Sequence, residues 1–518
     1  MLSLYLLYLV FWYTSVVNAL TRLQQLSYRY QRYKLDLKKG WWYQPKACIP
    51  FLLFTFVCFL VEHNKRLPIY LLWMMCLSFI LYRYHQQQDK RQTLTYTPRC
   101  IRLMVMLYFC LSLFLVSLIH LFTLPFFILF TPVIYYVPYG MILLALKCMQ
   151  PIEDTINRYY YDLAKDKLYH YPNLERIGIS GSAGKTSVKN MLVHCLKDEY
   201  YVLSTPYSYN TAMGISKVVN GQLNHLHEKF ICECGIDHLG EMDEIASLLA
   251  PDAVILTPIT NQHLATMKSR SYILKEKFKL AEALKEDGLL VVYGDDDVMS
   301  QACEQLKCQI IYYGSSFKND YQYDVKSIDE DGTYFTITYH EQSYEFHTCL
   351  FGEHAVMNIC AVVAMLHQKG ISFSQLQAKI KTLKFTPHRL EKKVMQEYIL
   401  LDDAYNANPQ GARFALEVLS KMPGKKILIS SGFVELGNEF ISSQAAFGIQ
   451  ASSCCDEIIL IGEQQCAAIL DAITTTGYDF KHVHLCQNMK DALVLVKMLA
   501  NQKTYVLIEN DLPDHYLS

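Results

Sequence analysis

The sequence predicts a multi-span α-helical membrane region followed by two α/β domains. Residues 1–149 contain long apolar runs, and residues 150–173 have the helical periodicity of a linker. Residues 174–386 alternate short apolar runs with amphipathic stretches, and residues 387–518 repeat that alternation. Such alternation is typical of a mostly parallel sheet covered by helices. We therefore expect a central P-loop domain and a Rossmann-like C-terminal domain.

Charge and cysteine usage separate the first part of the chain from the rest. Residues 1–150 hold 15 Lys and Arg against 3 Asp and Glu, whereas the remainder holds 33 against 46. This asymmetry indicates two physical classes of segment in one chain. None of the 17 cysteines forms a C-x-x-C pair, and Cys232-x-Cys234 and Cys454-Cys455 are poor zinc spacings. We expect a reducing compartment, with neither a zinc ribbon nor a disulfide framework.

Five apolar runs are candidate membrane spans: residues 2–19, 48–61, 67–82, 103–119 and 124–147. The first is uncharged, long enough to span, and lacks the cleavage site of a signal peptide. Loops 20–47 and 83–102 are basic, which places them on the cytoplasmic side. The N-terminus is then outside, and everything after Lys147 is cytoplasmic. Buried soluble helices remain an alternative for the two short runs, as do three or four spans.

The strands expected in the two α/β domains are short apolar runs between turn signals. In the central domain they are residues 176–180, 201–204, 229–234, 253–257, 288–293 and 309–313, followed by an antiparallel insertion over 321–350 and a helix over 353–369. In the C-terminal domain they are residues 398–402, 426–430, 457–461, 482–485 and 504–508.

A phosphate-binding loop follows the first of these strands. It reads G-x-x-G-K-T, with Ile179 where the longer P-loop pattern has its first glycine. Glycines let backbone N–H groups approach an anion, and the following helix adds the positive end of its dipole. Lysine can reach the terminal phosphates, and threonine can ligate magnesium. The candidate nucleotide-binding residues are Gly181, Ser182, Ala183, Gly184, Lys185, Thr186 and Ser187.

Three further candidates follow the loop. Glu233 ends a predicted buried strand next to a glycine, and a carboxylate at that edge of an α/β sheet favours a metal ligand. His263 follows the next strand, where a histidine by itself is more often structural. Lys277 lies in the run Lys275-Glu-Lys-Phe-Lys279, which by itself indicates a solvated helix face.

Taken together, these motifs resemble the Mur ligases in order and approximate spacing over residues 174–510. They are Gly181-Ser-Ala-Gly-Lys-Thr-Ser187, Glu233, His263, Lys277, Gly352-Glu-His354-Ala-Val-Met-Asn358, Pro387-His388-Arg389 and Asp402-Asp403-Ala-Tyr405-Asn406-Ala-Asn408-Pro409. The last string, followed by Glu435-Leu-Gly437, is similar to the MurF group. MurF ligases add D-alanyl-D-alanine to UDP-N-acetylmuramoyl-tripeptide.

The resemblance implies a role for each matching residue. Lys185 and the loop hold phosphates, while Thr186, Glu233, His263 and Lys277 serve two magnesium ions. Lys277 matches the lysine that is carbamylated in many members, with Lys275 and Lys279 as alternatives in another register. The adenine, ribose and γ-phosphate positions fall on His354, Asn358, Arg389 and Asp403. The substrate positions fall on Ser208, Asn210, Thr211 and Asn406.

The function implied by the resemblance is ATP-dependent amide-bond formation in peptidoglycan precursor synthesis. A muramoyl-tripeptide carboxylate would be activated as an acyl phosphate and joined to D-alanyl-D-alanine, with release of ADP and phosphate. The expected partners are a UDP- or lipid-linked muramoyl precursor, D-alanyl-D-alanine, the lipid bilayer and other cell-wall enzymes, and no nucleic acid. The expected location is the bacterial cell membrane, with the catalytic domains in the cytoplasm.

Two departures leave the acceptor open. MurF enzymes begin with a soluble uridine-nucleotide domain, where this chain has membrane spans. Residues 507–514 stand where many MurF enzymes carry a Lys-Gly-Ser-Arg-type substrate motif. The alternatives are a ligase for a lipid-linked precursor, with MurT-like amidation, a membrane-anchored poly-γ-glutamate synthase, or a non-catalytic membrane scaffold. The missing C-x-x-C pairs argue against MurT, and the retained loop and ligand residues argue against a scaffold.

Overall fold

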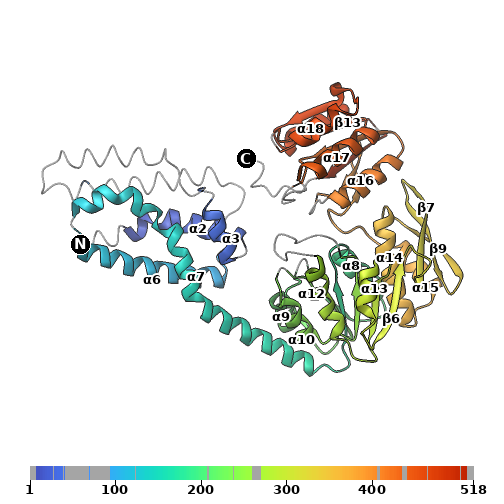
Figure 1. The fold of residues 1–518 in the computed structure, drawn as a ribbon, viewed down its shortest axis with the longest axis horizontal. Coiled ribbons are helices and arrows are strands. Elements are labelled where there is room, and N and C mark those ends of the chain that lie inside the picture. Colours follow the sequence, from blue (N-terminus) through green and yellow to red (C-terminus); the bar gives the residue numbers. More distant parts are fainter. Residues whose placement is uncertain are drawn as a thin grey trace. The chain divides into compact units, whose positions relative to one another are not determined.

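The computed structural model describes residues 8–26, 28–38, 40, 69, 94–122, 124–206, 209–236, 238–259, 270–404, 409–433, 440–463, 465–501 and 503–509. The chain forms two compact units, Met1–Arg158 and Tyr159–Ser518 (Figure 1). The predicted spans at 48–61 and, apart from residue 69, at 67–82 lie outside the described residues, as do residues 2–7.

The first unit is built from helices around an apolar core. They are α2 (Tyr13–Gln25), α3 (Tyr30–Leu37), α6 (Pro98–Leu121) and the first part of α7 (Leu124–Tyr169). The Trp12 indole donates a 2.7 Å hydrogen bond to the carbonyl of Ile134. The Arg22 guanidinium donates to both carboxylate oxygens of Asp36, at 2.7 and 2.9 Å. These polar links fix the segment before α2 against α7, and α2 against α3.

Two helices of the described part of the chain are long and apolar enough to cross a membrane. The most apolar 18-residue window has a mean hydropathy of 2.3 within residues 98–121 and of 1.3 within residues 133–169. The predicted runs 103–119 and 124–147 therefore fall on α6 and α7. Val105, Phe109 and Leu113 are 65%, 59% and 56% exposed at four-residue spacing, so one face of α6 is an apolar stripe. The five-span topology stays a prediction.

The second unit begins with a nine-stranded sheet in the order β2-β3-β1-β4-β5-β6-β7-β8-β9. The parallel strands are β1 (Glu175–Ser180), β2 (Val202–Ser204), β3 (Lys229–Glu233), β4 (Ala253–Leu256), β5 (Leu289–Tyr293) and β6 (Gln309–Gly314), which confirms the predicted central domain. Strands β7 (Tyr321–Asp329), β8 (Gly332–Tyr339) and β9 (Gln342–Thr348) are antiparallel as expected. They extend the same sheet, because β7 pairs with β6 in parallel.

Helices cover both faces of this sheet. One core gathers α8 (Lys185–Leu196), α14 (Glu353–Gln368) and α15 (Phe373–Lys381). The other gathers α9 (Ala212–Gln222), α10 (Glu241–Leu249), α12 (Arg270–Glu282), α13 (Asp297–Cys303) and the last turns of α7. Ile255 of β4 faces the first core and Val254 and Leu256 face the second. Burial on both faces explains why these strands read as continuous apolar runs.

The C-terminal sheet has the order β10-β11-β15-β12-β13-β14. Parallel strands β11 (Ile399–Asp402), β12 (Lys425–Ser430), β13 (Glu457–Ile461), β14 (Val483–Cys486) and β15 (Thr504–Glu509) confirm the predicted strands within two residues. Helices α16 (Pro409–Lys421), α17 (Phe440–Cys454) and α18 (Ala467–Thr474) pack on one face, and α19 (Met489–Leu499) on the other. The antiparallel edge strand β10 (Glu391–Val394) was not predicted, because its sequence Glu-Lys-Lys-Val has no apolar run.

Candidate active site

The loop after β1 has a backbone that only glycine fits at two positions. Gly181 has φ +143° and Gly184 has φ +83°. A Cβ at Gly181 would lie 1.9 Å from Thr257 Oγ1, and one at Gly184 would lie 2.2 Å from Asn358 Oδ1. The loop is therefore pressed between the end of β4 and helix α14, with no room for a side chain at either glycine.

The amides of the loop divide into two groups. Ser182 N donates to the carbonyl of Pro258 at 2.9 Å, which ties the loop to the segment after β4. The amides at the start of α8 form the second group, because the first N–H groups of a helix have no intrahelical partners. Lys185 lies in that first turn, and its Nζ donates to the carbonyls of Gly181 and Ser182 at 2.7 and 3.2 Å. Burial lowers the pKa of Lys185, although Glu233 partly offsets this effect. The result is a cradle of donors suited to an anion.

Glu233, the last residue of β3, faces this loop and is 3% exposed. Its Oε2 accepts hydrogen bonds from Thr186 Oγ1 at 2.9 Å and from Lys189 Nζ at 3.4 Å. Asn210 Nδ2 donates to its Oε1 at 3.5 Å. A carboxylate and a hydroxyl are the hard oxygen ligands that magnesium prefers. Lys189 was not predicted as a site residue, although a signal was present: it is a charged residue three positions after Thr186 on a helix packed into a core.

Of the three nearby lysines, Lys277 is the one that reaches the loop. Its Nζ donates to the Gly181 carbonyl at 2.6 Å and contacts Ser182 Oγ at 3.1 Å. The side chain is 3% exposed, and burial together with the charge of Lys185 holds its pKa well below the usual range. Lys275 is exposed, and Lys279 is bound to Asp243 and Glu276 at 2.6 and 2.7 Å. The geometry therefore favours the alignment with the family in which Lys277, and not Lys275 or Lys279, is the matching lysine.

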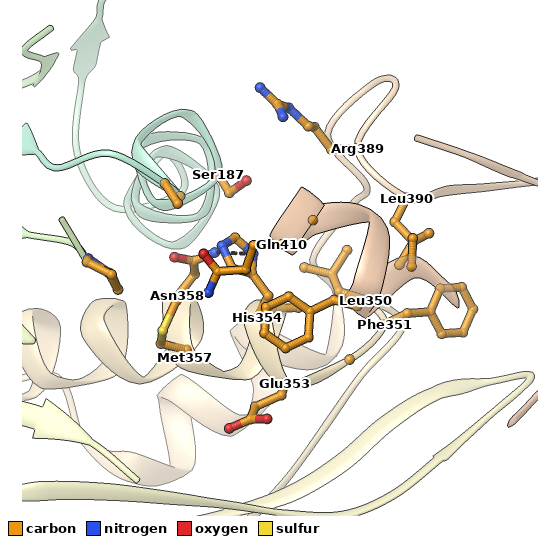
Figure 2. A pocket seen from close by; sticks show the side chains of 18 of the residues that line it. Ser187, Leu350, Phe351, Glu353, His354, Met357, Asn358, Arg389, Leu390 and Gln410 are labelled. Carbon is orange, nitrogen blue, oxygen red and sulfur yellow. Dashed lines mark hydrogen bonds between the residues drawn. The ribbon is translucent and has the colours of Figure 1, made fainter. Parts of the chain in front are cut away.

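Helix α14 brings His354 and Asn358 to the cavity (Figure 2). Asn358 Nδ2 lies 3.3 Å from His354 Nδ1. Burial, reinforced by the charge of Arg389, lowers the pKa of His354 to about 4, so the ring is neutral at pH 7. Asn358 Oδ1 is buried and has no hydrogen-bond partner among the described residues. An acceptor without a donor matches a ligand that carries an amino group.

The C-terminal domain supplies the other side of the cavity. Arg389 lies before β10 and Asp403 directly follows β11 (Figure 2 shows Arg389). Asp403 Oδ1 accepts a hydrogen bond from Leu390 N at 3.0 Å. Burial raises the pKa of Asp403 to about 6, although Leu390 N–H and the Arg389 charge act in the opposite direction. Glu509, which ends β15, also lines the cavity. Unlike Asp403, Glu509 was not predicted as a site residue.

The structure describes only some of the remaining predicted site residues. Thr211 caps α9 by accepting from Gly214 N at 3.2 Å, which is a structural role. Ser208, His263 and Asn406 lie outside the described residues, as do the motif residues 405–408 and 435–437.

One further group has the spacing of metal ligands, at the start of the C-terminal domain. His388, Glu391 and Asp402 offer donor atoms within 4.8 Å of one another. Lys393 Nζ lies 2.6 Å from Asp402 Oδ2 and 3.1 Å from Glu391 Oε2. Since an ammonium already occupies this carboxylate cluster, we assign it to the pairing of β10 with β11.

Most of the predicted site residues that the structure describes line one cavity of about 1600 Å³, although Gly181, Thr211 and Lys277 do not. Loop residues 182–187 and Glu233 form part of its wall, α14 provides His354 and Asn358, and the C-terminal domain provides Arg389, Asp403 and Glu509. A nucleotide held at the loop would therefore have its phosphates between two domains. Such an interdomain site is a common place for ligands that must be enclosed.

Comparisons with known proteins agree with this arrangement. Residues 179–366 match the Mur ligase middle domain, and residues 388–509 match the Mur ligase, glutamate ligase domain. The UDP-N-acetylmuramoyl-tripeptide–D-alanyl-D-alanine ligase of Bacillus subtilis is 34% identical over 51% of this chain and 57% of its own length. The ligase of the same name from Escherichia coli is 26% identical over 56% of this chain and 64% of its own length. The chain thus covers less than two thirds of the length of either relative.

Solved structures agree at the level of the fold. A MurF ligase from Thermotoga maritima, crystallised in complex with ADP, superposes with a TM-score of 0.61 at 20% identity, over 70% of this chain and 81% of that one. The two family models fall on the two α/β domains whose facing walls form the cavity. The chain carries the middle and C-terminal domains of a Mur ligase and belongs to that family.

Proposed function

We propose that this chain is an ATP-dependent ligase of the MurF type, which joins D-alanyl-D-alanine to the carboxylate of a muramoyl-tripeptide. The observation that carries the proposal is the shared cavity, in which Lys185 and Glu233 of one domain face Arg389 and Asp403 of another. Lys277 contacts the loop that forms part of the cavity wall. The names of the relatives from B. subtilis and E. coli support the same reaction.

The chemistry of the reaction requires such a cavity. A carboxylate is a poor acyl donor, so one of its oxygens attacks the γ-phosphorus of ATP and ADP leaves. The dipeptide amine then attacks the acyl carbon, loses a proton, and expels inorganic phosphate as the amide forms. Water would hydrolyse the acyl phosphate, so the site must exclude it. Arg389 and Asp403, which arrive from the second domain, offer that closure.

The residues of the loop fit ATP and magnesium. Lys185 and the first amides of α8 would hold the β- and γ-phosphates, and Thr186 with Glu233 would hold one magnesium ion. Asn358 Oδ1, buried and lacking a donor among the described residues, would accept from the adenine amino group. Magnesium supplies charge neutralisation during phosphoryl transfer. His263 is the proposed further ligand.

Lys277 fits the carbamylation that the family resemblance implies. Carbon dioxide adds only to a neutral amine, and burial beside Lys185 favours that form. The product carries a negative charge where the Lys277 amine now lies, 2.6 Å from the Gly181 carbonyl. A carboxylate-like group here would bind a second magnesium ion that a free ammonium repels.

We further propose that the first unit holds the enzyme in the bacterial cell membrane, as a multi-pass region with the catalytic domains in the cytoplasm. The exposed apolar stripe of α6 supports lipid contact, because such a face is unfavourable in water. The basic segments 20–47 and 83–102 support the orientation. Protease treatment of spheroplasts should leave a C-terminal tag intact, and cleavage of the tag without lysis would contradict the orientation.

The proposal has two versions, which differ in whether the acceptor tripeptide is linked to UDP or to a lipid. The experiment is phosphate release by the purified full-length protein with ATP, magnesium and D-alanyl-D-alanine, offered either acceptor. We expect turnover that requires all components and is lost in Lys185→Ala. Preference for the lipid-linked acceptor would favour the second version, and turnover with neither would overturn both.

A further inference from the structure

The first unit contains a second cavity, of about 240 Å³, which we call the interfacial pocket. Its walls come from three segments: residues 28–30 between α2 and α3, the start of α6, and residues 146–157 of α7. The positive-inside rule independently places these same three segments on the cytoplasmic side. The pocket therefore lies at one end of the apolar helix α6, where head groups would meet the protein.

Three cations line the interfacial pocket: Arg29, Arg99 and Lys147. Two of them lie over aromatic rings, with Arg99 Cζ 4.8 Å above Tyr28 and Lys147 Nζ 5.4 Å from the centroid of Tyr30. Such stacking orients a cation while leaving its N–H donors directed outward.

The acidic residues on the wall do not balance these charges. Glu153 is 8% exposed and accepts from Arg102 Nε at 2.7 Å, with Arg99 Nε at 3.6 Å. Since Arg102 neutralises Glu153 from outside the pocket, the exposed Asp154 is the only other carboxylate among the lining residues that the structure describes. The pocket keeps a net positive charge and suits an anion.

We propose that the interfacial pocket binds the phosphate head group of an anionic lipid, with the acyl chains along the apolar stripe of α6. Arginine matches phosphate with two parallel N–H donors, and basic pockets between membrane helices on the cytoplasmic side are suited to anionic head groups. Ile101, Val105 and Phe109 share one exposed helical face. Arg102 lies on the same side of the helix, one turn from Arg99. The inference rests on the membrane placement proposed above and is independent of the ligase reaction.

The test is native mass spectrometry of the full-length protein in a neutral detergent, with dioleoyl phosphatidylglycerol and dioleoyl phosphatidylcholine as probes. We expect the wild type to retain phosphatidylglycerol at least about 10-fold better than phosphatidylcholine. R99Q/K147Q should lose about 30-fold in affinity for phosphatidylglycerol, since each basic residue near an anionic lipid contributes a factor of about 5. Lys34→Gln is the matched control, because Lys34 is an exposed cation of the same region outside the pocket. An equal loss in Lys34→Gln, or no loss in R99Q/K147Q, would overturn the proposal.

Two further measurements keep the result decisive. R99K/K147R preserves both charges and should retain the lipid, which separates binding from misfolding. Inorganic phosphate offered alone distinguishes the source of the ligand: binding of phosphate without phosphatidylglycerol would overturn a lipid site. Phosphate release with soluble acceptor should be unchanged in R99Q/K147Q, so failure of the ligase proposal and failure of the lipid proposal give different results.

Discussion

The two walls of the large cavity differ in charge and in how well they keep the family pattern. The wall from the central domain is rich in donors, with Lys185 and Lys277 both bound to the Gly181 carbonyl. The wall from the C-terminal domain carries Arg389 but also two carboxyl groups, those of Asp403 and Glu509. Glu509 lies within residues 507–514, the stretch that departs from the Lys-Gly-Ser-Arg-type motif of many MurF enzymes.

This difference separates the two halves of the proposed reaction. Phosphoryl donation depends on the first wall, where each motif residue that the structure describes lies near the loop. Recognition of the acceptor depends on the second wall and on whatever holds the rest of the precursor. We expect substitutions on the first wall to abolish turnover with every acceptor, and substitutions on the second to have effects that depend on the acceptor and on pH.

The largest expected effect is that of Lys185→Ala. Removal of the cation that faces the phosphates should lower the rate of phosphate release by about 10²–10³-fold, the usual cost of losing one preorganised donor in an active site. The measurement is kcat with saturating ATP and each acceptor. Lys197→Ala, beyond the C-terminus of the same helix, is the control. A loss with one acceptor only would break the assignment of this wall to the donor half.

Lys277→Ala should lower turnover nearly as much, because it removes the proposed carbamate. Millimolar acetate should restore part of the activity by supplying a carboxylate to the vacated space. Lys275→Ala, an exposed neighbour two residues away, should behave as wild type. Full activity in Lys277→Ala, or equal losses in both variants, would contradict a specific role for Lys277.

Gly184→Ala tests the fit of the loop against α14. Its Cβ would overlap Asn358 Oδ1 at 2.2 Å, so ATP affinity should fall, together with about 1 kcal/mol or more of stability for the left-handed backbone. Gly370→Ala is the matched control: Gly370 has φ +92° and no atom within 4 Å of a Cβ. It should lose similar stability but keep ATP affinity, measured by calorimetry. Equal ATP affinity in the two variants would contradict the close packing.

The parallel strands of both α/β domains could be predicted from the sequence because they are buried on two faces. An apolar run such as Ala253–Leu256 has no competing interpretation between two turn signals. The charged edge strand β10 could not, because its stability comes from pairing with β11 and from the ion pairs of Lys393. The sequence also suggested a separate antiparallel insertion, whereas the pairing of Tyr313 with Tyr321 joins it to the main sheet.

The site was predictable where a motif fixes spacing along one segment. The loop and Glu233 belong to such segments, at the ends of neighbouring strands. Glu509 was missed for another reason: its place in the cavity depends on which way a strand end faces after packing. Spacing along the chain does not carry that information, because it arises from contacts between elements far apart in sequence.

The smallest expected effect is a difference in how two adjacent carboxyl groups, those of Asp403 and Asp402, make stability depend on pH. Burial raises the pKa of Asp403 from 3.8 to about 6, whereas hydrogen bonds from Lys393 and His388 outweigh burial at Asp402 and lower its pKa. Between pH 3.8 and 6 the folded state binds more protons than the unfolded chain at Asp403, so this group costs stability as pH rises through that window. At Asp402 the sign is opposite, and its stabilisation is present above pH 3.8 and is lost as pH falls below it.

Asp403→Asn should therefore raise the unfolding temperature relative to wild type, by an increment that grows from pH 4 to pH 6. The substitution keeps an oxygen to accept from Leu390 N. Asp402→Asn should lower the unfolding temperature at neutral pH, with a difference that shrinks in acid. Thermal unfolding of both variants across pH 3.5–7.5 measures these changes in unfolding temperature. Changes of the same sign in the two variants would contradict the difference in surroundings between the two carboxyl groups. Opposite signs would show that burial dominates at the cavity-facing carboxyl while ion pairs dominate one residue away.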